Sequence, residues 1–94
     1  MAEESLREFA ALHARSQASL REFFSVDLQI AFTLLDTARI EAYLDPEHRP
    51  AIIAQVESAL SGVRHLLGRI EDPQVWNELH SRANDLERQL RAEA

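Results

Sequence analysis

Apolar residues recur at alternating steps of four and three over much of the chain, the spacing that places side chains on one face of an α-helix. Between residues 47 and 70 this stripe consists of Ile52, Val56, Ala59, Val63, Leu66 and Ile70. Between residues 73 and 92 a narrower stripe consists of Trp76, Leu79, Ala83, Leu86 and Leu90. Because Ile53, Leu60 and Leu67 widen the first stripe, we expect its helix to lie between two neighbours.

Two Asp-Pro pairs mark where these helices begin. Asp45-Pro46 precedes the first helix and Asp72-Pro73 precedes the second. Asp is a favoured N-cap residue, and proline is tolerated in the first turn of a helix. The residue before a proline also avoids the α conformation, so Asp72 should end the preceding helix. The sequence therefore predicts helices over about 47–70 and about 73–92.

The N-terminal half predicts a much longer helix, because the first 45 residues contain neither glycine nor proline. The pentapeptide Ser-Leu-Arg-Glu-Phe occurs at residues 5–9 and again at 19–23. This offset of two heptads places its leucines and phenylalanines on nearly the same helical face. We favour one helix from about residue 5 to residue 44. Asp27 lies within the continuing apolar stripe and supports an alternative, a break near residues 17–27.

These elements predict one all-α domain over residues 1–94, an antiparallel bundle of three helices, or of four if the first is broken. A 40-residue helix is about 60 Å long, whereas each of the following helices is about 30 Å long. The first helix would therefore extend past its neighbours and expose an apolar patch that monomers seldom leave open. We expect a second copy of the chain or a helix of another protein to cover this patch.

The predicted function is a non-enzymatic module that acts by contact, as a homo-oligomer such as a dimer or by docking a partner helix. The predicted interface residues are Leu6, Phe9, Ala10, His13, Leu20 and Phe23. We expect His13 to form a hydrogen bond at this interface. The alternative function is binding of a small apolar ligand between helices. The residues that would line its pocket are the four aromatic residues Phe24, Phe32, Tyr43 and Trp76.

Charge and composition exclude several other classes of function. The formal net charge of −6 disfavours binding to nucleic acid or to an anionic membrane surface, both of which attract basic proteins. The apolar segment at residues 23–44 carries too many charged and polar residues for a membrane span. The chain has no cysteine, and its first residues are acidic rather than typical of a secretion signal, so we expect a cytoplasmic protein.

The sequence also lacks the usual signatures of catalysis and metal binding. Helical di-iron sites require Glu-x-x-His pairs, and none occurs. Asp45 and His48 have the same three-residue offset, but they lie at a predicted helix start. With only two glycines and no lysine, a phosphate-binding loop cannot form. We therefore expect no enzyme activity, no metal ion and no cofactor.

Overall fold

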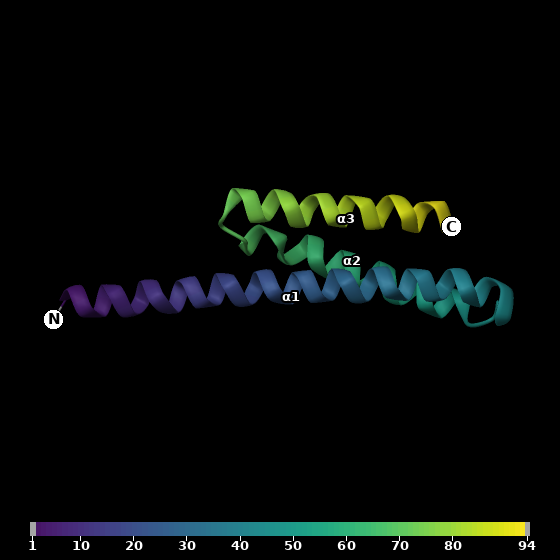
Figure 1. The fold of residues 1–94 in the computed structure, drawn as a ribbon, viewed down its shortest axis with the longest axis horizontal. Helices are drawn as coiled ribbons and strands as arrows, with labels where there is room; N and C mark the ends of the chain where they lie inside the picture. Colours follow the sequence, from purple (N-terminus) through teal and green to yellow (C-terminus); the bar gives the residue numbers. More distant parts are fainter. Residues whose placement is uncertain (1, 94) are drawn as a thin grey trace.

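The computed structural model describes residues 2–93, of which most lie in three α-helices (Figure 1). Helix α1 spans Ala2–Leu44, α2 spans Arg49–Leu66 and α3 spans Pro73–Glu93, with a short 3₁₀ turn, η1, at Leu67–Arg69. No strand occurs in residues 2–93. The prediction of an all-α bundle with one long N-terminal helix is confirmed.

Helix α1 is continuous through residues 17–27, so the alternative with a break in this region is wrong. Asp27 does not interrupt the helix because it lies beside the buried stripe rather than within it. Phe24 and Leu28 on either side of it are fully buried, whereas Asp27 is only half-buried. Its carboxylate can therefore reach water, which removes most of the cost of placing a charge next to the core.

Helix α2 begins later than the first Asp-Pro pair predicts. Asp45 does not cap it; instead the backbone N–H of His48 donates to the carbonyl of Asp45 at 3.1 Å, which closes a turn. The helix then starts at Arg49, with Pro50 in its first turn and no side-chain cap. Proline fits there because the first N–H groups of a helix have no partner within the helix.

Helix α3 begins where the second Asp-Pro pair predicts. The Asp72 carboxylate accepts hydrogen bonds from the backbone N–H groups of Gln74 at 2.9 Å and Val75 at 3.4 Å. Asp72 is therefore an N-cap whose oxygen satisfies two of the unpaired donors of the first turn. Before it, α2 tightens into η1 and the chain becomes extended at Ile70, so the α-helical part of this segment ends at Leu66 rather than near residue 70.

One apolar core lies between the three helices. Its largest fully buried side chains are Phe24, Leu28, Leu35, Leu86, Val56 and Val63. The buried residues of α2 and α3 belong to the predicted stripes, together with Leu60 from the residues that widen the first stripe. The stripe residues that are only partly buried are Ile52, Ala59, Leu66 and Trp76. The predicted apolar periodicity therefore determines which sides of α2 and α3 face α1.

A cluster of polar side chains joins all three helices near the C-terminal end of α1. The Nε atom of Arg39 donates to Glu93 at 2.7 Å, and its terminal nitrogens donate to Asp36 and Gln89. Arg49 of α2 also bonds Glu93. The hydrogen bond from Arg39 is the main cause of a lowered pKa of Glu93, and the same bond raises the pKa of Arg39. This end of the bundle is therefore closed by charge-assisted hydrogen bonds.

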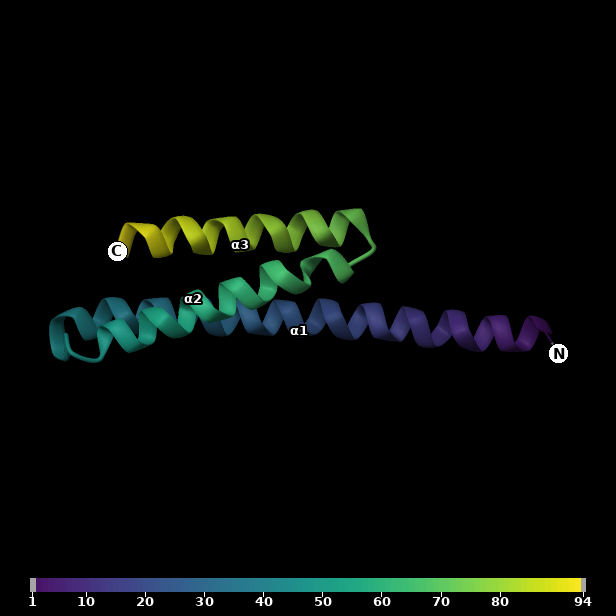
Figure 2. The same cartoon turned by 180° about the vertical axis from the view of Figure 1, so that it is seen from behind.

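The opposite end of α1 extends beyond its neighbours. Figure 2 shows the N-terminal part of α1 projecting past the connection between α2 and α3. The molecule measures 64 × 19 × 16 Å and has a radius of gyration of 17.4 Å, whereas a compact domain of this length has a radius of gyration of about 12 Å. Every described residue before Gln17 is exposed.

Candidate interaction surface

Helix α1 carries two apolar stripes on opposite sides. The inner stripe faces the core and consists of Phe24, Leu28, Ala31, Leu35 and Ala38, all of them fully buried. The second stripe, which we call the outer stripe, consists of Phe9, Leu12, Phe23, Val26, Ile30, Ile40 and Leu44. Residues two positions apart point about 200° apart around a helix axis, so Leu28 and Ile30 face opposite ways.

The outer stripe is exposed along the whole helix and not only where α1 overhangs. Phe9 is 70% exposed and Leu12 is 62% exposed in the overhang, while Ile30 and Ile40 are 52% and 57% exposed beside the bundle. Isolated apolar residues on a surface are normal, but many exposed apolar residues gathered on one face are typical of an interaction site. The outer stripe is therefore the main candidate interaction surface of this chain.

The outer stripe has the spacing of a coiled-coil seam. From Phe9 to Leu44 its residues lie at alternating steps of three and four once the small polar residues at the same spacing are included. Those polar residues are Ser16, Ser19, Thr33 and Thr37. The seam of a two-stranded coiled coil follows this 3.5-residue average, which keeps one line of side chains facing the partner helix.

The two threonines of the outer stripe can be buried at little cost. The hydroxyl of Thr33 donates to the backbone carbonyl of Gln29 at 3.0 Å, and the hydroxyl of Thr37 donates to that of Thr33 at 3.0 Å. A buried hydroxyl is costly only when it lacks a hydrogen-bond partner. Because these hydroxyls already have partners on their own helix, covering them would leave no donor unsatisfied.

A shallow hollow on the outer stripe resembles the socket of a coiled coil. It has a volume of about 260 Å³ and is lined by Val26, Gln29, Ile30, Thr33 and Leu34. The first four residues have the i, i+3, i+4, i+7 spacing. In knobs-into-holes packing, a side chain of the facing helix enters a hole formed by four residues of this kind.

The six predicted interface residues do not share one environment. Leu6, Phe9, Ala10 and Phe23 are exposed, and Leu6 is 69% exposed. Leu20 is instead partly buried and packs against the core. Its side chain lies on the flank of α1 nearest the bundle, so it contributes less free surface than the prediction assumes.

His13 lies where the overhang begins and is bound to its own chain. Its Nε2 atom lies 2.6 Å from the carboxylate of Glu71, and its ring stacks on Phe9 with centroids 6.3 Å apart. Four residues further on, the Gln17 amide donates to the carbonyl of Arg69 and accepts from the N–H of Glu71. These contacts attach α1 to the connection between α2 and α3, so residues 2–12 form the free overhang.

The four aromatic residues proposed as pocket lining are not brought together around a cavity. Phe24 is fully buried in the core, whereas Tyr43 is 90% exposed at the other end of α1. Trp76 stacks on His80, with ring centroids 4.5 Å apart. Three of the four residues are spread along α1, where Phe24 and Tyr43 are separated by about 28 Å of helix, and Trp76 lies on α3.

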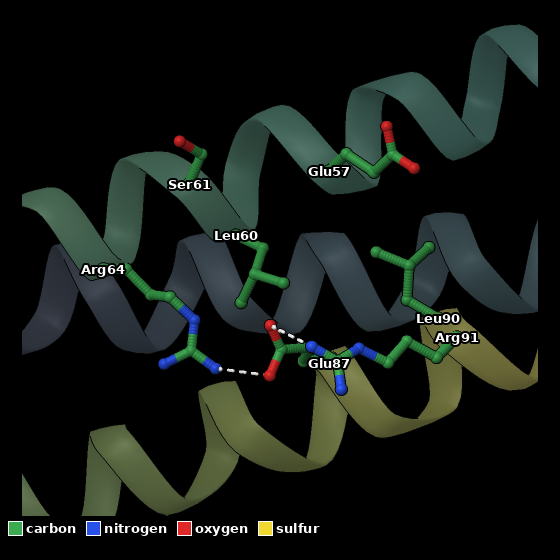
Figure 3. A pocket seen from close by; sticks show the side chains of 7 residues that line it. All are labelled: Glu57, Leu60, Ser61, Arg64, Glu87, Leu90 and Arg91. Atoms are coloured by element: carbon green, nitrogen blue, oxygen red, sulfur yellow. Dashed lines mark hydrogen bonds and ion pairs between the residues drawn. The ribbon is translucent and has the colours of Figure 1, made fainter.

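A hollow of about 410 Å³ lies elsewhere, between α2 and α3 (Figure 3). Leu60 and Leu90 are its apolar residues, and the others are Glu57, Ser61, Arg64, Glu87 and Arg91. The carboxylate oxygens of Glu87 lie 3.1 Å from a guanidinium nitrogen of Arg64 and 3.5 Å from one of Arg91. Since these charges pair with one another across the hollow, their arrangement is explained by contacts within the chain.

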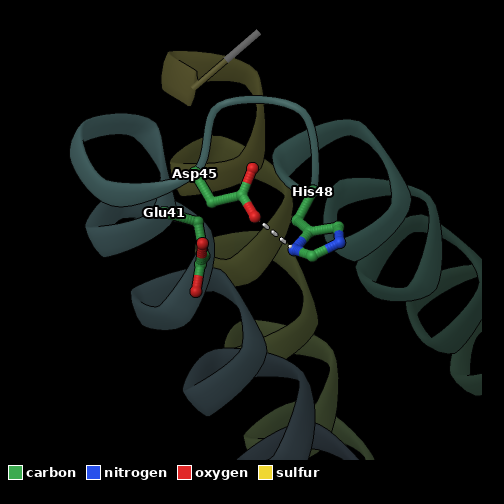
Figure 4. Close-up of side chains that lie close together, drawn as sticks. All are labelled: Glu41, Asp45 and His48. Carbon is green, nitrogen blue, oxygen red and sulfur yellow. Dashed lines mark ion pairs between the residues drawn. The ribbon is translucent and has the colours of Figure 1, made fainter.

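Three potential metal ligands come together at the turn between α1 and α2 (Figure 4). One ligand atom from each of Glu41, Asp45 and His48 lies within 4.8 Å of the others. One nitrogen and two carboxylate oxygens are ligands that zinc accepts. However, His48 Nδ1 lies 2.8 Å from the Asp45 carboxylate, so this ion pair is sufficient to explain the arrangement.

Comparison with known proteins gives no further guidance, because no protein-family profile, no curated protein and no solved structure matches this chain. Within residues 2–93, no helix combines the length and the apolar character that crossing a membrane would require.

Sequence reasoning missed most of the outer stripe. It assigned the interface to the N-terminal half and treated the apolar residues after Phe24 as a single stripe, so Leu12, Val26, Ile30 and Ile40 were not proposed as interface residues. The signal is nevertheless present in the sequence as a second set of apolar positions, of which Val26, Ile30 and Ile40 each lie two residues from a position of the inner stripe. Two such sets give one long helix two apolar faces.

Proposed function

We propose that this chain is a protein–protein interaction module that self-associates through the outer stripe of α1. The observation that supports the proposal is the long apolar surface that the three helices leave uncovered. The accessible surface is 6702 Å², whereas a compact monomer of this mass has about 5500 Å². The excess of about 1200 Å² is larger than the area of about 800 Å² that each partner buries in a typical stable interface.

Self-association fits the outer stripe better than binding of a small ligand. A ligand pocket is concave and encloses most of its ligand, whereas the outer stripe is a convex line of side chains along one helix. Such a line is matched in length and shape by another long helix. A second copy of α1 is available at equal concentration whenever the chain is present.

The composition supports a module that acts without catalysis, metal or cofactor, in the cytoplasm. The net charge of −6 disfavours nucleic acid and anionic lipid as partners. The absence of cysteine suits a reducing compartment.

A pair of matched double variants tests the proposal. Phe9→Glu with Leu12→Glu places two carboxylates on the outer stripe of the overhang, where both side chains are exposed. Ala11→Glu with Ala14→Glu places the same charge on the other side of the same part of α1, also at exposed positions. Sedimentation equilibrium over a dilution series measures the mass of the particle. We expect a mass of more than one chain for the unaltered protein and for the variant with Glu at positions 11 and 14. We expect the mass of one chain for the variant with Glu at positions 9 and 12. Removal of residues 1–22 should also lower the number of chains in the particle. A single-chain mass for the unaltered protein at every micromolar concentration would contradict the proposal.

A further inference from the structure

Charged residues lie on both sides of the outer stripe. Their signs distinguish the orientations in which two copies of α1 could pair. We propose that two chains associate through their outer stripes as an antiparallel pair of α1 helices, with Phe23 facing Val26 of the partner subunit at the centre. This inference rests on the proposed function and adds an orientation and a register to it.

The register follows from the apolar positions. When Phe23 faces Val26 of the partner subunit, Phe9 faces Ile40 of the partner subunit and Ser16 faces Thr33 of the partner subunit. The overhang of each chain then lies against the C-terminal part of the other chain's α1, where Ile40 is 57% exposed and Leu44 is 76% exposed. The overhang of each chain would thus cover the part of the outer stripe that lies beside the bundle in the other chain. Together the two contacts would cover the outer stripe along the length of α1.

The flanking charges favour the antiparallel direction. Residues beside a coiled-coil seam approach the flanks of the facing helix, and their charges set its orientation. In the antiparallel register, Arg15 approaches Asp36 of the partner subunit, and the two-fold symmetry repeats this attractive pair. In a parallel pair, Glu22 would approach Asp27 of the partner subunit and Asp36 would approach Glu41 of the partner subunit. Both parallel contacts bring like charges together, which is unfavourable.

The same charges favour this register over the two antiparallel registers that lie one heptad away. Sliding the helices by one heptad in one direction places Glu22 beside Glu22 of the partner subunit. Sliding them by one heptad in the other direction places Glu22 beside Asp36 of the partner subunit. Only the register with Phe23 facing Val26 of the partner subunit pairs Arg15 with Asp36 and avoids these like-charge contacts.

Disulfide trapping can test this geometry because the chain contains no cysteine of its own. Ser16→Cys and Thr33→Cys replace two polar residues of the outer stripe and leave its apolar residues intact. Bridged cysteines need Cα atoms within about 7 Å of each other. In the proposed register, position 16 of one chain faces position 33 of the other, whereas the two copies of position 16 are about 25 Å apart. A mixture of the two variants should therefore form a mixed disulfide dimer on oxidation, and Ser16→Cys alone should not form a dimer.

Ser58→Cys, exposed on α2, is the control for random collisions. The proposal expects a two-chain mass before oxidation and several-fold more linked dimer from the mixture than from the control. A two-chain mass with linkage of Ser16→Cys to itself, or with no linkage above the control, would overturn the antiparallel register but leave self-association standing. A mass of three or more chains would also overturn the two-stranded arrangement. A single-chain mass with no linkage above the control would overturn both proposals.

Discussion

The inner and outer faces of α1 carry apolar residues at the same alternation of three and four, yet they end in different environments. Phe24, Leu28 and Leu35 of the inner stripe are fully buried, whereas Phe23 and Ile30 of the outer stripe are more than half exposed. The two other helices of the chain cover one side of α1 only. Residue spacing thus determines which side chains share a face, but the number of neighbouring helices determines which face is covered.

The most direct way to test this difference is to shorten one side chain on each face. Leu28→Ala leaves a cavity in the core and should lower the free energy of unfolding by about 2 to 5 kcal/mol. Ile30→Ala removes a side chain that is 52% exposed, so it should change the free energy of unfolding of the monomer by only about 0.5 kcal/mol. The higher helix propensity of alanine also offsets part of the stability that is lost with the isoleucine side chain.

Urea unfolding at a low, monomeric concentration of chain measures both variants. Circular dichroism reports loss of the helices, and the midpoint at unchanged slope gives the difference in stability. If Ile30→Ala proved as destabilising as Leu28→Ala under these conditions, the outer stripe would have to be covered within the monomer, and the distinction between the two faces would fail.

The dependence of stability on concentration sharpens the comparison, because only the outer face should respond to a second copy. Above the dissociation constant, each tenfold rise in concentration stabilises a dimer by about 1.4 kcal/mol, or about 0.7 kcal/mol per chain. For a chain of this size, the melting temperature should rise by about 3 to 5 °C. Thermal unfolding followed at several concentrations measures the rise.

The matched variants identify the face that responds. Phe9→Glu with Leu12→Glu should have a melting temperature independent of concentration, while Ala11→Glu with Ala14→Glu should behave like the unaltered chain. Equal concentration dependence in the two double variants would show that association, if present, uses another surface.

Much of the fold could be predicted from the sequence because its determinants are local. The absence of glycine and proline before Pro46 predicted one long helix, and the capping carboxylate of Asp72 predicted where α3 starts. Asp45 has the same sequence context but forms a turn with His48 instead. The difference could not be read from the Asp-Pro pairs, because it depends on the geometry of the reversal between α1 and α2.

The candidate interface was predicted only in part, for a different reason. An overhang follows from helix lengths, and so do the exposed positions of Leu6 and Phe9. The fate of Leu20 and of Ile30 depends on which side of α1 the rest of the chain covers. That choice is made when the wide apolar stripe of α2 packs against α1. The sequence of α1 contains two apolar stripes, and α2 could have packed against either of them.

Charged contacts provide the smallest expected effect and a further test of whether the two faces are independent. Arg39 and Glu93 lie on the inner side of the bundle, and their hydrogen bond lowers the pKa of Glu93 below its usual 4.5. A carboxylate with a lowered pKa in the folded state stabilises that state above its unfolded pKa. This contribution is lost as the pH falls through the lowered value.

Glu93→Gln should therefore lower the melting temperature slightly at pH 7, and the difference from the unaltered chain should disappear as the pH falls through the lowered pKa of Glu93. Glu57→Gln, at an exposed position of α2, controls for the loss of one negative charge. Thermal unfolding at fixed chain concentration between pH 3 and pH 7 measures both variants. Because Glu93 bonds Arg39 and Arg49 and no residue of the outer stripe, its replacement should leave the number of associated chains unchanged. A Glu93→Gln variant that became monomeric would show that the polar cluster supports the outer stripe as well, so that the two faces of α1 could no longer be treated as separate.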